Sequence, residues 1–234
     1  MKDLKSFPHT LELDLLVQKD GEIIYQRYTS DADFGRNVNG LSMAKNIVAL
    51  LIGIAIDEGK IGSEYDLIAH HISELNHEDN SGITIRNLLQ HTSGVTSALS
   101  DLQSTMTGQL IERDLTEITF QKDAPFKYDN LNYYLLNILL QNLYQKPLSS
   151  IIEDKLWKPL GLSEASIINT TGYCCMFAKA DAWLAIGDLY LNGGEKIISS
   201  IWIEKMVEDT VMPEWFFVQA TGKSTTNTYG YHVY

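Results

Sequence analysis

The strongest constraint on the fold is a helix-length run of apolar residues early in the chain. Residues 42–58 are apolar on nearly every face of a helix, and Gly59 follows where helices commonly end in left-handed backbone. Such a helix has no polar face for water, so other elements must surround it. Its most apolar stretch, 47–56, contains Gly53 and is far shorter than the roughly 20 residues of a membrane span. We therefore expect a buried central helix and no membrane span.

Strand signals flank a helical middle section of the chain. Strand-like segments at 11–18 and 22–28 enclose Asp20-Gly21, a pair typical of a tight hairpin turn, and strand character returns at 215–218 and 229–234. Helical patterns lie between them, at 84–89, 130–144, 148–156, 178–191 and 198–208. This order predicts an α/β (α+β) fold, with an antiparallel sheet lobe built from both termini and an inserted all-helical lobe. We expect one domain over 1–234, with the sheet lobe at about 1–40 and 212–234, the helical lobe at about 60–211, and the 42–58 helix between them.

Charge and metal-ligating residues exclude several classes of partner. The chain has 18 Lys+Arg against 30 Asp+Glu, a net charge of −12, and such a surface repels phosphate backbones. His70, His71 and His77 stand near Glu78 and Asp79, but their spacing fits no metal motif, and a solvated loop is the better interpretation. The two cysteines are adjacent and provide no second pair for a zinc site. We predict no nucleic-acid partner and no metal.

A serine and a lysine stand three residues apart at the start of the apolar helix. In this S-x-x-K motif, Ser42 and Lys45 share one helix face, so the amine can reach the hydroxyl. A serine becomes a nucleophile when a base takes its proton, and burial lowers the pKa of a lysine toward the range of a base. The helix start also offers a backbone N–H to an oxyanion. The alternative is an N-capping Ser42 with an exposed Lys45.

A second candidate group lies on the turn before the helix at 130–144. Tyr128 and Asn130 are two residues apart, so a phenol that relays a proton and an amide that holds a substrate carbonyl can face one cleft. The alternative is that Asp129 or Asn130 only caps the helix.

Together with three further segments, these motifs resemble the serine β-lactamase and penicillin-binding-protein superfamily, most closely its class C-like branch with esterases and 6-aminohexanoate-oligomer hydrolases. The further segments are LLQHTSGV at 88–95, WKPLGL at 157–162, and 178–194, which begins AKAD. The resemblance implies a β-lactamase/transpeptidase fold and hydrolysis of a small-molecule ester or amide without a cofactor. It implies that Ser42 is acylated, that Lys45 and Tyr128 share the acid/base work, and that Asn130 contacts substrate. It also implies that His91, in the H-T-S-G turn, is a hydrogen-bonded scaffold residue beside the cleft.

The family's third motif, a K-T-G or H-x-G triplet on a sheet strand, has no clear counterpart. Lys223-Ser224-Thr225 departs from it and precedes Tyr229-Gly230-Tyr231, which resembles the segment that normally comes before the triplet. We therefore expect an incomplete sheet in this sequence, with an open edge at which copies of the chain could associate. A non-catalytic remnant or fragment that acts as a binding or assembly module is the alternative to an enzyme.

Overall fold

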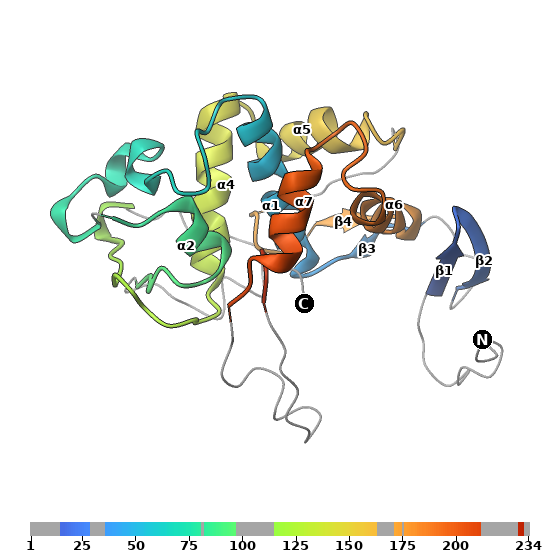
Figure 1. Cartoon of the computed structure of the whole chain (residues 1–234), viewed down its shortest axis with the longest axis horizontal. Helices are drawn as coiled ribbons and strands as arrows, with labels where there is room; N and C mark the ends of the chain where they lie inside the picture. The colour runs from blue at the N-terminus through green and yellow to red at the C-terminus, as the bar shows by residue number, and fades with distance from the viewer. Residues whose placement is uncertain are drawn as a thin grey trace, which may run out of the picture.

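The computed structural model of the protein describes residues 15–28, 36–80, 82–96, 115–162, 171–174, 176–211 and 229–231. Most of its elements are helices (Figure 1). The strands are β1 Leu15–Lys19, β2 Glu22–Arg27, β3 Val38–Asn39 and β4 Phe177–Ala178. The α-helices are α1 Met43–Asp57, α2 Ile85–Leu89, α4 Asn130–Tyr144, α5 Leu148–Ile152, α6 Ala180–Leu191 and α7 Ser200–Glu208. A π-helical turn, Glu153–Trp157, extends α5, and short 3₁₀ turns occupy much of the segment from Ile68 to Asn80.

Helix α1 forms the centre of the molecule, as its apolar sequence predicts. Eleven of its residues are buried, and it packs against α4 and α7. The approach of α7 depends on Gly53, because a Cβ there would lie 2.1 Å from the Trp202 ring. The Trp202 indole N–H donates to the carbonyl of Ala49 at 3.0 Å, which fixes the ring against the α1 backbone. The prediction of a buried central helix is confirmed.

Two small antiparallel sheets accompany the helices. Strands β1 and β2 form the predicted hairpin, and Asp20 and Gly21 take the positive φ angles, 52° and 82°, that its turn requires. Gln18 donates to the carboxylate of Asp188 at 2.7 Å, and this bond joins the hairpin to α6. Strands β3 and β4 form the second sheet.

Strand β4 is a difference from the expected all-helical stretch at 60–211. It is two residues long, Phe177–Ala178, and is a strand only because it pairs with β3. The expected strand at 215–218 and the triplet at 223–225 lie outside the described residues. Tyr229 forms an isolated antiparallel bridge with Val211. The division into a sheet lobe and a helical lobe stays a prediction.

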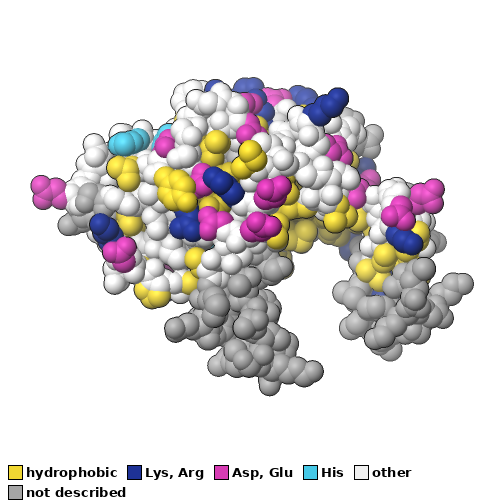
Figure 2. Space-filling model, in the orientation of Figure 1, with side chains coloured by type: hydrophobic (Ala, Val, Ile, Leu, Met, Phe, Trp, Pro, Cys, Tyr) yellow, Lys and Arg dark blue, Asp and Glu magenta, His cyan; other side chains and the backbone are white. Residues whose placement is uncertain are grey.

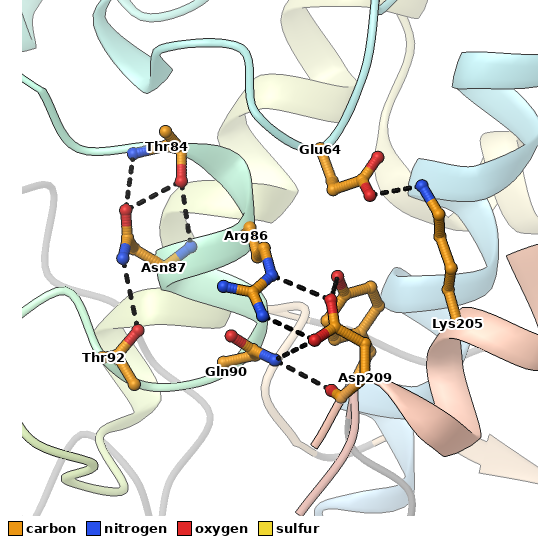
Figure 3. Close-up of polar contacts among 9 residues, drawn as sticks. Glu64, Thr84, Arg86, Asn87, Gln90, Thr92, Lys205 and Asp209 are labelled. Carbon is orange, nitrogen blue, oxygen red and sulfur yellow. Dashed lines mark hydrogen bonds and ion pairs between the residues drawn. The ribbon is translucent and has the colours of Figure 1, made fainter. Parts of the chain in front are cut away.

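A polar cluster ties α2 to the end of α7 (Figure 3). Arg86 donates two guanidinium hydrogen bonds to the Asp209 carboxylate, at 2.5 and 2.8 Å, and Gln90 and Tyr231 donate to the same carboxylate. The Arg86 bond is the largest cause that holds the pKa of Asp209 below its usual value, and the same bond raises the pKa of Arg86. The cluster thereby connects Asp209, at the end of α7, with Tyr231 and with α2.

The surface charges and the lengths of the helices bear on what the protein can contact. On the face in Figure 2, acidic and basic side chains are interspersed rather than segregated. Within the described ranges, no helix has the length and apolar character needed to span a membrane.

Candidate active site

A short turn between β3 and α1 presents Ser42. Gly40 donates to the carbonyl of Met176 at 2.9 Å, so the turn starts from the β3–β4 sheet. Gly40 admits no side chain, because a Cβ would lie 2.2 Å from the Trp183 ring of α6. Leu41 then adopts a left-handed φ of 47°, a strained conformation for leucine, while its N–H donates to the Asn39 side chain at 2.9 Å. The backbone therefore turns sharply before the helix begins.

Ser42 and Lys45 are in hydrogen-bond contact on the first turn of α1. The Lys45 Nζ lies 3.3 Å from the Ser42 Oγ, and Ser42 makes no side-chain cap bond to the helix. Lys45 is 0% exposed. The alternative of an N-capping Ser42 with an exposed Lys45 is therefore wrong.

The surroundings of Lys45 disfavour its charged form. Burial in apolar surroundings is the largest effect and lowers the pKa of Lys45 to about 7, although the negative charge of Asp129 acts in the opposite direction. Its Nζ donates to the carbonyl of Tyr173 at 2.8 Å and lies 4.7 Å from the centre of the Tyr128 ring. Near neutral pH, a substantial fraction of this amine is therefore uncharged and can accept a proton.

Tyr128 reaches the same hydroxyl from another part of the chain. Its phenol donates to the Ser42 Oγ at 2.9 Å. Asp129 is the N-cap of α4 and accepts from the N–H of Leu131 at 2.9 Å, so the helix cap and the tyrosine that contacts Ser42 occur on one turn. Asn130 is the first residue of α4 and is partly buried, but it is not among the partners of the Ser42 Oγ. The structure thus brings together Ser42, Lys45 and Tyr128, and Asn130 lies two residues after Tyr128 in the chain.

The start of α1 also offers a donor to a developing anion. Among the described residues, no backbone hydrogen bond uses the N–H of Ser42. This N–H lies at the positive end of the helix dipole, beside the hydroxyl that would attack a carbonyl.

Sequence reasoning missed the carbonyl of Tyr173, the partner that holds the Lys45 amine. Gly172 places it: its φ is 86°, and a Cβ there would lie 2.6 Å from the Asn137 Cβ of α4. A backbone carbonyl gives no side-chain signal, so only the glycine marks this position in the sequence.

The histidine-rich segment lies apart from this site. His71 lies 3.6 Å from the Asp66 carboxylate, and burial lowers the pKa of its ring. His77 contacts Asn80 at 2.7 Å. The part of the chain that the structure describes contains no group of three His, Cys, Asp or Glu side chains able to hold a metal ion.

Comparison with known proteins identifies the family of this chain and supports its fold. The family model that matches, Beta-lactamase, covers residues 7–171. Protein flp of Staphylococcus aureus (strain MRSA252) is 25% identical over 174 residues, which are 68% of this chain and 35% of that protein. The chain therefore spans about a third of the length of this curated relative.

Solved structures show the same fold at low sequence identity. The octameric penicillin-binding protein homologue from Pyrococcus abyssi matches with a TM-score of 0.74 and 19% identity, over 94% of this chain and 59% of that one. The D-amino acid amidase from Ochrobactrum anthropi matches with a TM-score of 0.66 and 14% identity, over 88% of this chain and 67% of that one. The predicted β-lactamase/transpeptidase-like fold is thereby confirmed.

Proposed function

Because this chain belongs to the beta-lactamase family, we propose that it is a serine hydrolase that cleaves a small-molecule ester or amide through an acyl-enzyme on Ser42. One observation carries the proposal: the Ser42 hydroxyl contacts both the Lys45 amine, at 3.3 Å, and the Tyr128 phenol, at 2.9 Å. A nucleophilic serine needs a base within hydrogen-bond reach and a group that returns a proton to the leaving group. Lys45 and Tyr128 fill these two roles in the proposed reaction.

Acylation starts from the neutral form of Lys45. The amine takes the hydroxyl proton of Ser42 while the Oγ bonds to the substrate carbonyl carbon, and the carbonyl π electrons move to its oxygen. The N–H of Ser42 stabilises the resulting oxyanion. When the intermediate collapses, the bond to the leaving alkoxide or amine breaks, Tyr128 gives that group its phenol proton, and the proton held by Lys45 replaces it.

Deacylation reverses these proton movements with water as the nucleophile. Water bonds to the acyl carbon and gives a proton to the Lys45–Tyr128 pair, and the acid product leaves as Ser42 regains its proton. We assign Asn130 to the substrate, as the amide that holds the substrate carbonyl. No step requires a metal ion or an organic cofactor.

The substrate class follows from this chemistry and from one relative. An acyl-enzyme route fits any carbonyl compound whose leaving group can accept a proton, so esters, peptides and β-lactams all qualify. The name of the O. anthropi D-amino acid amidase supports small amides as one class to test.

Covalent labelling of Ser42 tests the proposal. The purified protein is incubated with a fluorophosphonate, and separately with a labelled penicillin, and is then weighed intact and after digestion. With the fluorophosphonate, an Oγ–P bond forms and the P–F bond breaks, so the adduct is stable. We expect one adduct on Ser42, its loss in Ser42→Ala, and slow labelling in Lys45→Ala.

A second serine provides the matched control. Ser199 precedes α7 and makes no side-chain cap bond, so Ser199→Ala is expected to label like the unchanged protein. Absence of an adduct with both probes between pH 6 and 9 would overturn the proposal and favour a non-catalytic binding or assembly module.

A further inference from the structure

His91 lies in the turn that follows α2 and is only 1% exposed. Its φ of 55° is left-handed, and Gly94 in the same turn has a φ of 58°. A Cβ on Gly94 would lie 2.6 Å from the Cβ of Gln121, so the turn packs closely against the segment that leads to Tyr128. The turn is thereby held beside the candidate site.

Three separate contacts connect His91 with Tyr128 and its two chain neighbours. The N–H of Lys127 donates to the His91 carbonyl at 2.9 Å, and the N–H of Asp129 donates to the His91 Nδ1 at 3.2 Å. The imidazole stacks on the Tyr128 ring, with centroids 4.6 Å apart and planes 23° from parallel. His91 therefore contacts Lys127, Asp129 and the Tyr128 ring through its side chain or its backbone.

The hydrogen bonds also determine the tautomer of His91. A backbone N–H can only donate, so the Nδ1 that accepts from Asp129 carries a lone pair. Asn132 Nδ2 lies 3.2 Å from the same Nδ1 and donates to the Asp129 carbonyl at 3.1 Å, while its Oδ1 lies 2.5 Å from the Ser93 Oγ. These partners fix the orientation of the Asn132 amide, so both groups donate to Nδ1. A neutral ring then has its proton on Nε2.

From these contacts we infer that His91 is a positioning residue for Tyr128, which holds the phenol oxygen at hydrogen-bond distance from the Ser42 Oγ. The inference rests on the proposed function. His91 is not among the partners of Ser42, so it acts through Tyr128 rather than on the reacting atoms. Its ring restricts the tilt of the phenol, and Nδ1 restricts the backbone between residues 127 and 129. Displacement of a catalytic group by about 1 Å can cost about 100-fold in rate.

A purely structural role for His91 predicts something different. Phe126, Tyr133 and Tyr229 also lie against the ring, so a substitution could weaken the core without any specific effect on Tyr128. A structural defect would slow Ser42 labelling equally whether or not the Tyr128 hydroxyl is present. If His91 instead positions the Tyr128 hydroxyl, its substitution should have little further effect on the labelling rate once that hydroxyl is removed.

A double-mutant cycle between the two residues separates these roles. The rate of fluorophosphonate labelling of Ser42 is measured for the unchanged chain, His91→Phe, Tyr128→Phe and the double variant, each below its own melting temperature. We expect His91→Phe, which keeps a ring but loses the acceptor, to be slower by about 10- to 100-fold in the unchanged background. In the Tyr128→Phe background we expect a change below about threefold, since residues that act as one unit are not additive. Equal effects in both backgrounds would overturn the inference.

A conservative variant and a remote histidine complete the experiment. His91→Asn keeps an acceptor near the Nδ1 position and tolerates positive φ, so it should recover part of the rate lost in His91→Phe. The exposed His70 is the matched control, and His70→Asn should label at the original rate. Labelling of His91→Asn as slow as that of His91→Phe would contradict a role for Nδ1.

Imidazole nitrogen NMR tests His91 independently of any activity. The resonances that disappear in His91→Asn are assigned to His91, and we expect an unprotonated Nδ1 and a protonated Nε2. A protonated Nδ1 would overturn the inference even in an active enzyme. If Ser42 is never labelled while the expected tautomer is observed, the proposed function fails and the His91 geometry stands.

Discussion

The phenol of Tyr128 donates a hydrogen bond of 2.9 Å to the hydroxyl of Ser42, although 86 positions separate them in the chain. Ser42 immediately precedes α1, and Tyr128 lies just before α4. The two helices pack against each other, so this hydrogen bond depends on their packing. Lys45, by contrast, reaches Ser42 within a single helical turn.

Removal of the Tyr128 hydroxyl should affect labelling far more than stability. Tyr128→Phe keeps the ring that stacks on His91 and removes the bond to Ser42. We expect labelling to slow by about 100-fold or more, the usual effect of losing an acid/base group, and the free energy of unfolding to fall by about 1 kcal/mol. Tyr144→Phe, which loses a surface bond to Glu58, is the control. Equal labelling rates of the two variants would contradict a role for the phenol.

The lowered pKa of Lys45 predicts a rise of the labelling rate with pH. Only the neutral amine can take the Ser42 proton, and its pKa of about 7 means that the neutral fraction increases as the pH passes through that value. We expect the labelling rate to reach half its upper plateau near pH 7. Intact-mass spectrometry of samples quenched at successive times measures this rate. A midpoint above pH 9 would show that Lys45 keeps the ordinary pKa of an exposed lysine.

Gly53 and Gly187 should respond oppositely to alanine. Alanine normally stabilises a helix interior by about 1 kcal/mol relative to glycine, and Gly187 in α6 has nothing within 4 Å of its Cβ position. At Gly53 the Cβ would overlap the Trp202 ring, and overpacking of this kind costs about 1–3 kcal/mol. Chemical denaturation should therefore show a more stable Gly187→Ala and a less stable Gly53→Ala. A Gly53→Ala variant as stable as the unchanged chain would mean that α7 does not rest on α1 as described.

Asp209 should make the free energy of unfolding depend on pH in the acid range. Its pKa is below the unfolded value, chiefly through the bond to Arg86, so its stabilisation is present above the unfolded pKa and is lost as the pH falls through the folded pKa. Asp209→Asn should lower the free energy of unfolding at pH 7 by about 1 kcal/mol, a value reduced for solvent screening. In denaturation curves, the difference in free energy of unfolding between the variant and the unchanged chain should shrink toward pH 3. Asp123→Asn, in an exposed turn, is the control, and a difference that stays constant with pH would contradict the assignment.

The long helices and the hairpin could be predicted because their signals are local. The apolar positions between Asn130 and Tyr144 repeat with a helical period, and α4 has these bounds. Asp20-Gly21 specifies its own turn type. Strand β4 could not be predicted, since two residues carry no periodicity and its partner β3 is far away in the chain.

The environment of Lys45 shows the corresponding limit for the site. The S-x-x-K spacing alone predicts contact with Ser42, but an exposed lysine has the same spacing. The Lys45 amine lies 4.7, 6.0 and 5.9 Å from the ring centres of Tyr128, Tyr133 and Tyr173. Tyr173 lies far along the chain from the other two. The sequence does not indicate that these three rings lie around one nitrogen, nor that the amine is buried, and burial is what lowers its pKa.

The mixture of local and distant contacts around Ser42 has a consequence during folding. Contacts within one helical turn form early, whereas contacts between distant segments form late. In a chain with α1 formed but α4 not yet docked, Lys45 is solvated and therefore protonated at neutral pH, because water supports its charge. Such a state would have its serine and lysine side by side but would lack the neutral base that the proposed reaction requires. In the proposed reaction, the reactivity of Ser42 therefore reports that the native packing of α4 on α1 is complete.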